Sequence, residues 1–391
     1  MGLKKPHLFC VLAIASVAAL LPIPVGAAPT VTTVTTGLDS PRGIAFFDGR
    51  LVVGEAGHGG SDCFAIPGAP PGFSICIGGT SQISWVNRSN GTHTPLVSGL
   101  FSIMAGPEAL GVSGLSASDD RLLVQIGFTP REAPPNITLA QTQAGHLISV
   151  NPNGTWTSIA PVGTIDFDYT TRFPQPVFGG PVIQGTQEHD ANPYGVLATG
   201  DGALVADAGS NTLDSVDEDG HVKILIHDLF RADPPTFPSD AVPTCVVRGE
   251  KGLLVGELSG RLLKVHGTSF TPIVLKDSAG KSLLTHVTGC TTDRRGNVYF
   301  VNMFGPDPVF TQTGPTSSYF MGNVVKYNPE SGEGSVLVSG LRFPNMDTVG
   351  PDGNLYVTVG SVCGTTPAAD GECAGLTGSV VKITLPHAEN D

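Results

Sequence analysis

Charged side chains are scarce in this 391-residue sequence, at 14% of all positions. Coiled coils and helical bundles need many charged helix formers, so the low charge argues against both classes. The 51 glycines and 32 prolines argue in the same direction, because both residue types favour turns over helix interiors. Apolar residues still make up 40% of the chain, which is enough to bury a core. The composition therefore predicts a folded, all-β protein.

Several motifs of known enzyme sites are also missing. The sequence has no phosphate-binding loop, no His-Glu-x-x-His zinc motif and no dinucleotide-binding glycine fingerprint. No Cys-x-x-Cys spacing occurs, which disfavours a structural zinc site. Ser113, in the segment GVSGL, lacks the second glycine of a nucleophile elbow, so we predict a structural role for it. A functional site must therefore come from residues that the fold brings together.

The N-terminal segment has the three parts of a secretory signal peptide. Residues 1–27 contain two lysines, an apolar run over 8–21 and small residues before Ala27. The run is too short for a membrane anchor, and no later segment is apolar enough to span a membrane. We predict cleavage after Ala27, which leaves a single domain over 28–391 that is secreted, or periplasmic in a Gram-negative bacterium.

The predicted mature chain is acidic. Removal of the two N-terminal lysines changes the formal net charge from −13 to −15. An acidic surface repels phosphate backbones, so we expect no nucleic-acid partner.

Six cysteines remain after the signal peptide, and an even set in an exported chain predicts disulfide bonds. Their number alone allows 15 pairings. We expect Cys63–Cys76 and Cys363–Cys373, because each pair closes a short loop rich in Gly or Pro, and this leaves Cys245 with Cys290. Four Asn-x-Ser/Thr sequons would accept glycans in a eukaryotic source: Asn87, Asn90, Asn136 and Asn153.

Six similar apolar runs, each preceded by a turn, indicate an internal repeat. They are GRLVVGE (49–55), DRLLVQI (120–126), GALVADA (202–208), GLLVGEL (252–258), GNVYFVN (296–302) and GNLYVTV (353–359). Most of the runs have an apolar segment before them and two further short apolar segments after them. Four strands in each of six repeats predict a six-bladed β-propeller with four-stranded blades.

The last repeat predicts how the ring closes. No fourth strand follows residues 378–385, whereas residues 30–38 resemble the fourth strands of other repeats. We therefore expect the N-terminal strand to complete the last blade. Five repeats share a spacing of twelve positions between their first two strands, as from Cys290 to Asn302, and the first strand of the sixth, around 343–349, fits less well.

This register places polar side chains at the ends of four second strands. They are Glu55, Asp207, Glu257 and Asn302, while Ile126 and Val359 hold the same position in the other two repeats. Three carboxylates and an amide near the axis would suit Ca²⁺, a hard cation that prefers several oxygen ligands. Alternatively, each side chain accepts hydrogen bonds from backbone N–H groups of the neighbouring blade and holds the ring together. The sequence leaves both interpretations open.

Long loops follow the second strands, and the topology gathers them at one mouth of the ring. Such a face is usually the binding face. Residues at or just before first strands share this mouth and are the candidate ligand-binding residues: Arg42, Glu108, Asn192, Tyr194 and Asn345. Three histidines also reach it and could act as acid or base, with an ordinary surface role as the alternative: His58, His189 and His286.

Three segments carry a family resemblance. They are GLDSPRGIAF with GRLVVGEAGHGG, then NPYGVLATGDGALVADAGSNTLDSVDEDG, and AVPTCVVRGEKGLLVGELSGRLLKV. They resemble the ScyD/ScyE family of exported propellers related to the NHL type. The resemblance implies the fold and an association with synthesis of an extracellular indolic-phenolic pigment, and it provides no catalytic set to carry over. Cys245 and Cys290 depart from the glycine that is more usual there.

Three functions remain open. The first is an exported, monomeric protein that binds a small organic ligand at the loop-rich mouth, accessory to extracellular natural-product metabolism. The second is a Ca-dependent lactonase or esterase-type hydrolase that uses the four oxygen ligands and one of the histidines. The third is a protein-interaction platform with an exposed apolar patch.

Overall fold

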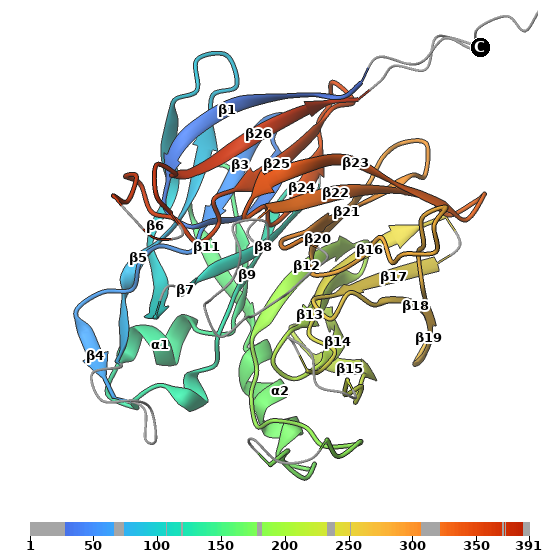
Figure 1. Ribbon diagram of the computed structural model, residues 1–391. Coiled ribbons are helices and arrows are strands. Elements are labelled where there is room, and N and C mark those ends of the chain that lie inside the picture. The colour runs from blue at the N-terminus through green and yellow to red at the C-terminus, as the bar shows by residue number, and fades with distance from the viewer. Residues whose placement is uncertain are drawn as a thin grey trace, which may run out of the picture. The chain divides into compact units, whose positions relative to one another are not determined.

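The computed structural model describes residues 28–65, 74–106, 108–118, 120–177, 182–232, 239–250, 252–305, 321–369, 371 and 373–385. The predicted signal peptide lies outside these ranges, and its cleavage stays a prediction. The described chain forms six antiparallel sheets (Figure 1). No helix in these ranges is long and apolar enough to cross a membrane.

Four of the sheets are blades of four sequential strands. The second blade contains β8 (Val112–Ala117), β9 (Leu122–Ile126), β10 (Leu147–Val150) and β11 (Trp156–Ala160). The third contains β12 (Pro193–Thr199), β13 (Gly202–Asp207), β14 (Thr212–Asp217) and β15 (Val222–His227). The fourth contains β16 (Pro243–Gly249), β17 (Gly252–Glu257), β18 (Leu262–His266) and β19 (Ser269–Ile273). The fifth contains β20 (Val287–Thr292), β21 (Val298–Asn302), β22 (Met321–Asn328) and β23 (Glu333–Arg342).

The first and sixth blades depart from this plan. The first contains β2 (Pro41–Phe47), β3 (Arg50–Glu55), β5 (Ile75–Val86) and β6 (His93–Ala105), extended by β4 (Asp62–Phe64) and β7 (Glu108–Leu110). The sixth contains β24 (Asp347–Val349), β25 (Leu355–Val359), β26 (Gly378–Thr384) and β1 (Thr30–Leu38). β1 pairs antiparallel with β26 along its length, which confirms that the N-terminal strand completes the last blade.

The first strands of the blades pack against one another in a closed ring, in the order β2, β8, β12, β16, β20, β24 and back to β2. Neighbouring backbones approach closely there, so glycine is required at several of the contacts. A Cβ at Gly114 would lie 2.5 Å from Tyr194 O, and one at Gly195 would overlap Thr244 O. The six-bladed propeller is therefore confirmed, with its axis lined by these six strands.

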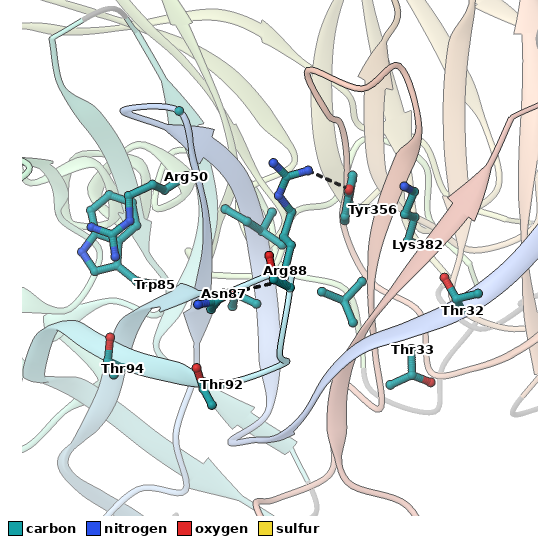
Figure 2. A pocket seen from close by; sticks show the side chains of 15 residues that line it. Thr32, Thr33, Arg50, Trp85, Asn87, Arg88, Thr92, Thr94, Tyr356 and Lys382 are labelled. Carbon is teal, nitrogen blue, oxygen red and sulfur yellow. Dashed lines mark hydrogen bonds between the residues drawn. The ribbon is translucent and has the colours of Figure 1, made fainter.

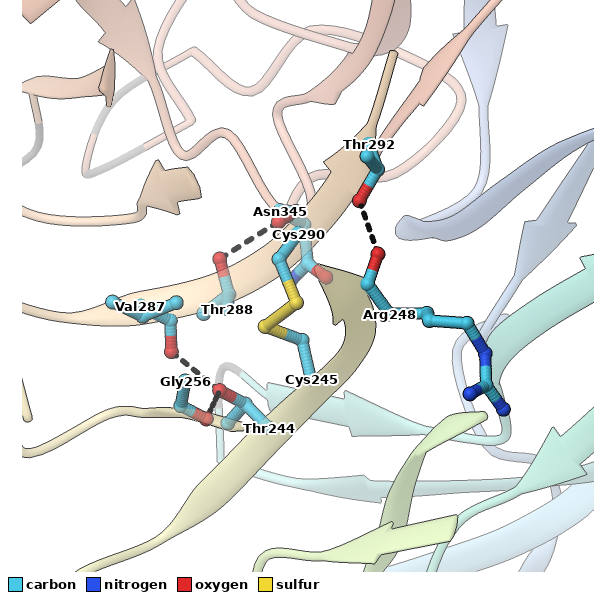
Figure 3. Close-up of a disulfide and its surroundings, with 9 residues drawn as sticks. All are labelled: Thr244, Cys245, Arg248, Gly256, Val287, Thr288, Cys290, Thr292 and Asn345. Carbon is cyan, nitrogen blue, oxygen red and sulfur yellow. Dashed lines mark hydrogen bonds between the residues drawn. A yellow bond between two sulfur atoms is a disulfide. The ribbon is translucent and has the colours of Figure 1, made fainter. Parts of the chain in front are cut away.

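Hydroxyl groups beside three of these contacts tie one blade to the next. Thr244 Oγ1 donates to Val287 O at 2.6 Å, and Thr288 Oγ1 donates to Asn345 O at 2.8 Å (Figure 3). Ser113 Oγ is placed in the same way and lies 3.3 Å from Pro193 O. These bonds support the structural role that the sequence predicts for Ser113.

All three predicted disulfides are present, Cys63–Cys76, Cys245–Cys290 and Cys363–Cys373. Cys245–Cys290 joins the innermost strands of two blades, with 5.8 Å between the Cα atoms (Figure 3). One detail of the predicted register is wrong. Pairing to the second strand makes Gly289, and not Cys290, the equivalent of Cys245.

The reason is the turn length. Five residues separate the paired Thr292 and Val298 of the fifth blade, whereas four separate the equivalent pair, Arg248 and Leu253, of the fourth. The twelve-residue spacing therefore shifts by one position in the fifth blade.

The loop segments at the predicted binding mouth contain helices that the sequence pattern did not predict. They are η1 (Pro130–Glu132), α1 (Thr138–Gln143) and α2 (Val162–Thr170). With β4, the two α-helices gather at the lower end of the ring in Figure 1. We call this end the loop-rich mouth.

Candidate ligand site at the propeller axis

Four of the five predicted ligand-binding residues meet in one hydrogen-bonded network. Arg42, on β2, donates from Nη1 to Tyr194 OH at 3.3 Å and from Nη2 to Glu108 Oε1 at 3.0 Å. The same Nη2 donates to Ala109 O at 2.7 Å. Tyr194 OH, on β12, donates to Asn345 Oδ1 at 2.7 Å. The network, which we call the axial network, thus joins the first, third and sixth blades.

Most of the axial network is buried. Arg42 is 3% exposed, Tyr194 5% and Asn345 0%, whereas the Glu108 side chain is 57% exposed. Burial alone would lower the pKa of Arg42, but Tyr194 and Glu108 raise it above its usual value, so the guanidinium stays charged. Glu108 is therefore the point at which the network reaches solvent.

Two donors of the axial network have no acceptor within the described chain. They are Arg42 Nε and Asn345 Nδ2, and both atoms are buried. A buried donor without a partner costs about 1–3 kcal/mol, so an additional acceptor at this point, a water molecule or a ligand, would stabilise the network.

Arg42 and Tyr194 also break the pattern of the ring. Each stands just before the innermost glycine of its strand, as Ser113 and Thr288 do in their blades. Ser113 and Thr288 bond to the carbonyl of the adjacent blade. Arg42 and Tyr194 instead bond to each other, although the whole second blade lies between them in the ring order. In these two blades a long charged or aromatic side chain therefore takes the place of a short hydroxyl group.

The axial channel is too small for an organic ligand. Its cavity of about 40 Å³ has room for a water molecule and little else. The Cys245–Cys290 disulfide and Asp347 line it. Both carboxylate oxygens of Asp347 lack a hydrogen-bond partner within the described chain, and burial raises its pKa well above the usual value. A ligand at this mouth must therefore lie above the axial network, on the side of Glu108.

The four predicted metal ligands are each bonded locally. Both carboxylate oxygens of Glu55 are in use: Oε2 accepts from Asp39 N at 2.7 Å, and Oε1 accepts from Gln82 Nε2 at 2.8 Å and Ser84 Oγ at 2.5 Å. All of these partners belong to the first blade or to the segment that enters it. Glu55 thus holds the chain where it enters β2.

The other three make similar bonds. Asp207 Oδ1 accepts three backbone N–H groups, from Asn192, Gly209 and Ser210, at 2.8–3.0 Å. Glu257 Oε2 accepts from Ser259 Oγ at 2.9 Å and lies 3.3 Å from Arg261 Nη1. Asn302 Oδ1 accepts from Thr285 N at 3.0 Å, and its Nδ2 donates to Leu283 O and Asn323 Oδ1.

The sequence allowed these four residues either to bind a metal or to hold the ring together through hydrogen bonds. The observed bonds are largely of the second kind, except that the donors lie in the same blade and not in the neighbouring one. Within the described ranges, no hydrogen bond or ion pair joins any two of the four residues. In the described residues, one group of three potential metal ligands has its ligand atoms within 4.8 Å of one another. It consists of Asp217, Asp219 and His221. It is an exposed turn in which Asp217 Oδ1 accepts from the backbone of the other two. The four-residue set as it stands does not fit a shared ion, and the calcium site stays a prediction.

The remaining predicted site residues lie outside the axial network. Asn192 Oδ1 accepts from Phe128 N at 2.9 Å. His58 is exposed and its Nδ1 lies 2.5 Å from Asp39 Oδ2. His189, half-buried, precedes β12, and His286, buried, precedes β20 and packs edge-on against Phe304 at 5.4 Å between ring centroids. The sequons at Asn87, Asn90, Asn136 and Asn153 are all exposed, and their glycosylation stays a prediction.

A cluster of buried acids was missed by the sequence analysis. Asp166 of α2 faces Asp207 of β13 and Asp214 of β14, and all three side chains are 0% exposed. Burial, and for Asp166 and Asp214 the repulsion between the carboxylates, raises the pKa of each acid. No sequence signal links Asp166 to this blade, because it lies in an unpredicted helix.

Comparisons with known proteins support the fold. No family model matches the chain, and no curated protein matches it. A protein of unknown function from Bacteroides thetaiotaomicron has a similar structure, with a TM-score of 0.52, 9% identity, and coverage of 91% of this chain and 76% of that one.

Two other solved structures fall below a TM-score of 0.5. A gluconolactonase from Xanthomonas campestris has a TM-score of 0.48 at 11% identity, over 91% of this chain and 89% of that one. An aldose sugar dehydrogenase from Streptomyces coelicolor has 0.45 at 12%, over 92% and 99%. No function follows from these likenesses, and the ScyD/ScyE resemblance stays a prediction.

Proposed function

We propose that this chain is an exported propeller that binds a small organic carboxylate at the loop-rich mouth, above the axial network. The observation that carries the proposal is the convergence of Arg42, Tyr194 and Asn345 from three blades, with two buried donors left over. Export rests on the predicted signal peptide, and three disulfides are compatible with it.

The charge of Arg42 defines the ligand class. A buried guanidinium binds carboxylates strongly, because its planar fork can donate two hydrogen bonds to one acid. Glu108 now supplies a single oxygen to Arg42, and its side chain is more than half exposed. A ligand carboxylate can therefore replace Glu108 at low cost. The ScyD/ScyE resemblance suggests that such a ligand belongs to extracellular natural-product metabolism, and we expect the protein to act as a monomer.

The test compares matched acids and amides. Isothermal titration of the full chain with benzoate and benzamide should give binding for the acid only, and Tyr194→Phe should weaken it about tenfold, the cost of one charge-supported hydrogen bond. Equal binding of benzoate and benzamide, or no binding of either, would reject the proposal.

The same preparation tests the hydrolase alternative. Hydrolysis of glucono-δ-lactone that stops on addition of EDTA, together with stoichiometric calcium by elemental analysis, would favour a metal-dependent lactonase. The platform alternative would instead be supported if a protein partner bound to an apolar patch of this mouth while benzoate did not.

A further inference from the structure

A second cavity lies on the face opposite the loop-rich mouth. Its volume is about 710 Å³, and it opens between the first and sixth blades, where β1 closes the ring. One wall carries Arg50 and Trp85 of the first blade, and the other carries Thr33 of β1 and Lys382 of β26 (Figure 2). We call this cavity the seam groove.

Three cations line the seam groove of a chain whose formal net charge is −13: Arg50, Arg88 and Lys382. Asp352 partly neutralises two of them, at 2.8 Å from Lys382 Nζ and 4.0 Å from Arg88 Nη1. Arg50 has no acidic partner in the described chain. The groove therefore holds more positive than negative charge.

The cations are held in place. The Arg50 guanidinium lies over the Trp85 ring at 3.9 Å from its centroid. Arg88 Nη1 donates to Tyr356 OH at 3.0 Å, and Figure 2 shows Arg88 between Arg50 and Lys382. Side chains ordered before binding lose less conformational entropy when a ligand arrives.

Hydroxyl groups make up much of the remaining lining. Thr32, Thr33, Ser89 and Thr94 have hydroxyls without a side-chain hydrogen bond in the described chain. The aromatic surface is less accessible, since Trp85 is covered by Arg50 on one face and stacks with Phe47 at 5.9 Å. The lining thus favours a hydroxylated, anionic ligand over an apolar one.

We propose that the seam groove binds an acidic saccharide of one or two rings that carries carboxylate or sulfate groups. The volume lies within the range of small-molecule sites, roughly 300–1,000 Å³. Arg50 and Lys382 would each pair with an acidic group, and the threonine hydroxyls would bond to ring hydroxyls. Because the ligand would contact both sides of the seam, its binding would hold β1 against the first blade.

The experiment uses the full mature chain, produced without glycans because the Asn87 sequon lies in the groove. Titration calorimetry with digalacturonate, with a sulfated disaccharide and with neutral maltose distinguishes carboxylate, sulfate and neutral sugars. We expect binding of at least one acidic saccharide and none of maltose, with an affinity that falls as salt is added.

Variants locate the site. Arg50→Gln combined with Lys382→Gln should weaken binding tenfold or more. Thr33→Glu adds a negative charge at an exposed position and should weaken it similarly while leaving the Arg50–Trp85 and Lys382–Asp352 contacts in place. Lys223→Gln, an exposed lysine of the third blade, should leave affinity unchanged. Bound saccharide should also slow hydrogen exchange in residues 30–35.

Two results would overturn the proposal. One is equal affinity for maltose and the acidic saccharides, or binding of none of them. The other is an affinity that neither Thr33→Glu nor the double variant reduces. Because Arg42 and Tyr194 are at the opposite mouth, their variants should not affect this binding, so failure here is distinct from failure of the carboxylate site.

Discussion

Two sets of buried polar residues lie at the same mouth and differ in how they bond. Glu55, Asp207, Glu257 and Asn302 end the second strands, and the partners seen for each lie in its own blade or its adjoining segments. Arg42 and Tyr194 lie on the innermost strands and bond across the ring. Bonding within one blade favours a structural clamp, whereas bonding across the ring favours a binding site. An unpartnered buried atom does not separate the two sets, because Asp207 Oδ2 and Glu257 Oε1 also lack a hydrogen-bond partner in the described chain. Burial and polarity alone do not separate the two.

The largest effect is expected from Glu55→Ala. It leaves the Asp39 N–H, Gln82 and Ser84 donors without their acceptor, at about 1–3 kcal/mol each where they stay buried. Urea denaturation should show a loss of 3 kcal/mol or more, roughly, with benzoate affinity unchanged. Glu55→Gln, which keeps one acceptor, should cost less. If Glu55→Ala left the urea midpoint unchanged and abolished benzoate binding, Glu55 would belong to the ligand site and not to the structural set.

The next effect concerns pH. Burial raises the pKa of Glu257 to about 8, with Asp228 adding to the shift and Arg261 opposing it. An acid with a raised folded pKa contributes stability below its ordinary pKa and loses it as pH rises through the folded value. The free energy of unfolding should therefore fall on the order of 2 kcal/mol between pH 5 and 9.

Glu257→Gln should reduce that loss, because an amide does not ionise, but should not abolish it, because burial also raises the pKa values of other acids such as Asp347. Asp217→Asn is the control, since Asp217 is exposed and its backbone hydrogen bonds lower its pKa. A wild-type protein that becomes more stable as pH rises from 5 to 9 would contradict the raised pKa.

A smaller change is expected from Arg42→Lys, which keeps the charge and loses the fork of donors. Benzoate affinity should fall about tenfold, with a stability loss below that of Glu55→Ala. Chemical denaturation and calorimetry on one preparation separate the two effects. If Arg42→Lys destabilised the fold as much as Glu55→Ala while binding stayed intact, Arg42 would belong with the clamps.

The smallest effect, opposite in sign, is expected from Glu108→Gln. Removing the exposed carboxylate that competes for Arg42 should raise benzoate affinity two- to fivefold, roughly, and change stability by less than about 1 kcal/mol. Glu330→Gln, an exposed acid outside the axial network, is the control. Weaker binding in Glu108→Gln would mean that Glu108 contributes to the site and does not compete with the ligand.

Repetition made the fold and part of the site predictable. The repeated strand pattern predicts which residues begin the first strand of each blade. Arg42 and Tyr194 could therefore be placed at one mouth from the sequence alone. The disulfides followed from loop length and elimination. The one-residue error at Cys290 shows the limit, because turn length varies between blades and pairing is set by the turn.

Features outside the repeat were not predictable. Asp166 lies on a helix between blades, and Asp347 lies on a three-residue strand whose alignment was poor. The seam groove joins residues about 350 positions apart, such as Thr33 and Lys382, and ordinary surface threonines and lysines give no local signal. The sequence also left the role of Glu55, Asp207, Glu257 and Asn302 open. A carboxylate at the end of a strand gives the same sequence pattern whether it binds an ion or a backbone N–H group.

The seam has a further consequence for how the protein matures. β1 leaves the ribosome first, and β26, which it must pair with, leaves last. Until β26 has been synthesised, each molecule therefore carries an unpaired strand, and afterwards the edge of β26 can pair with β1 of any other copy. Concentrated refolding should yield domain-swapped dimers through exchange of β1, whereas dilute refolding should yield closed monomers.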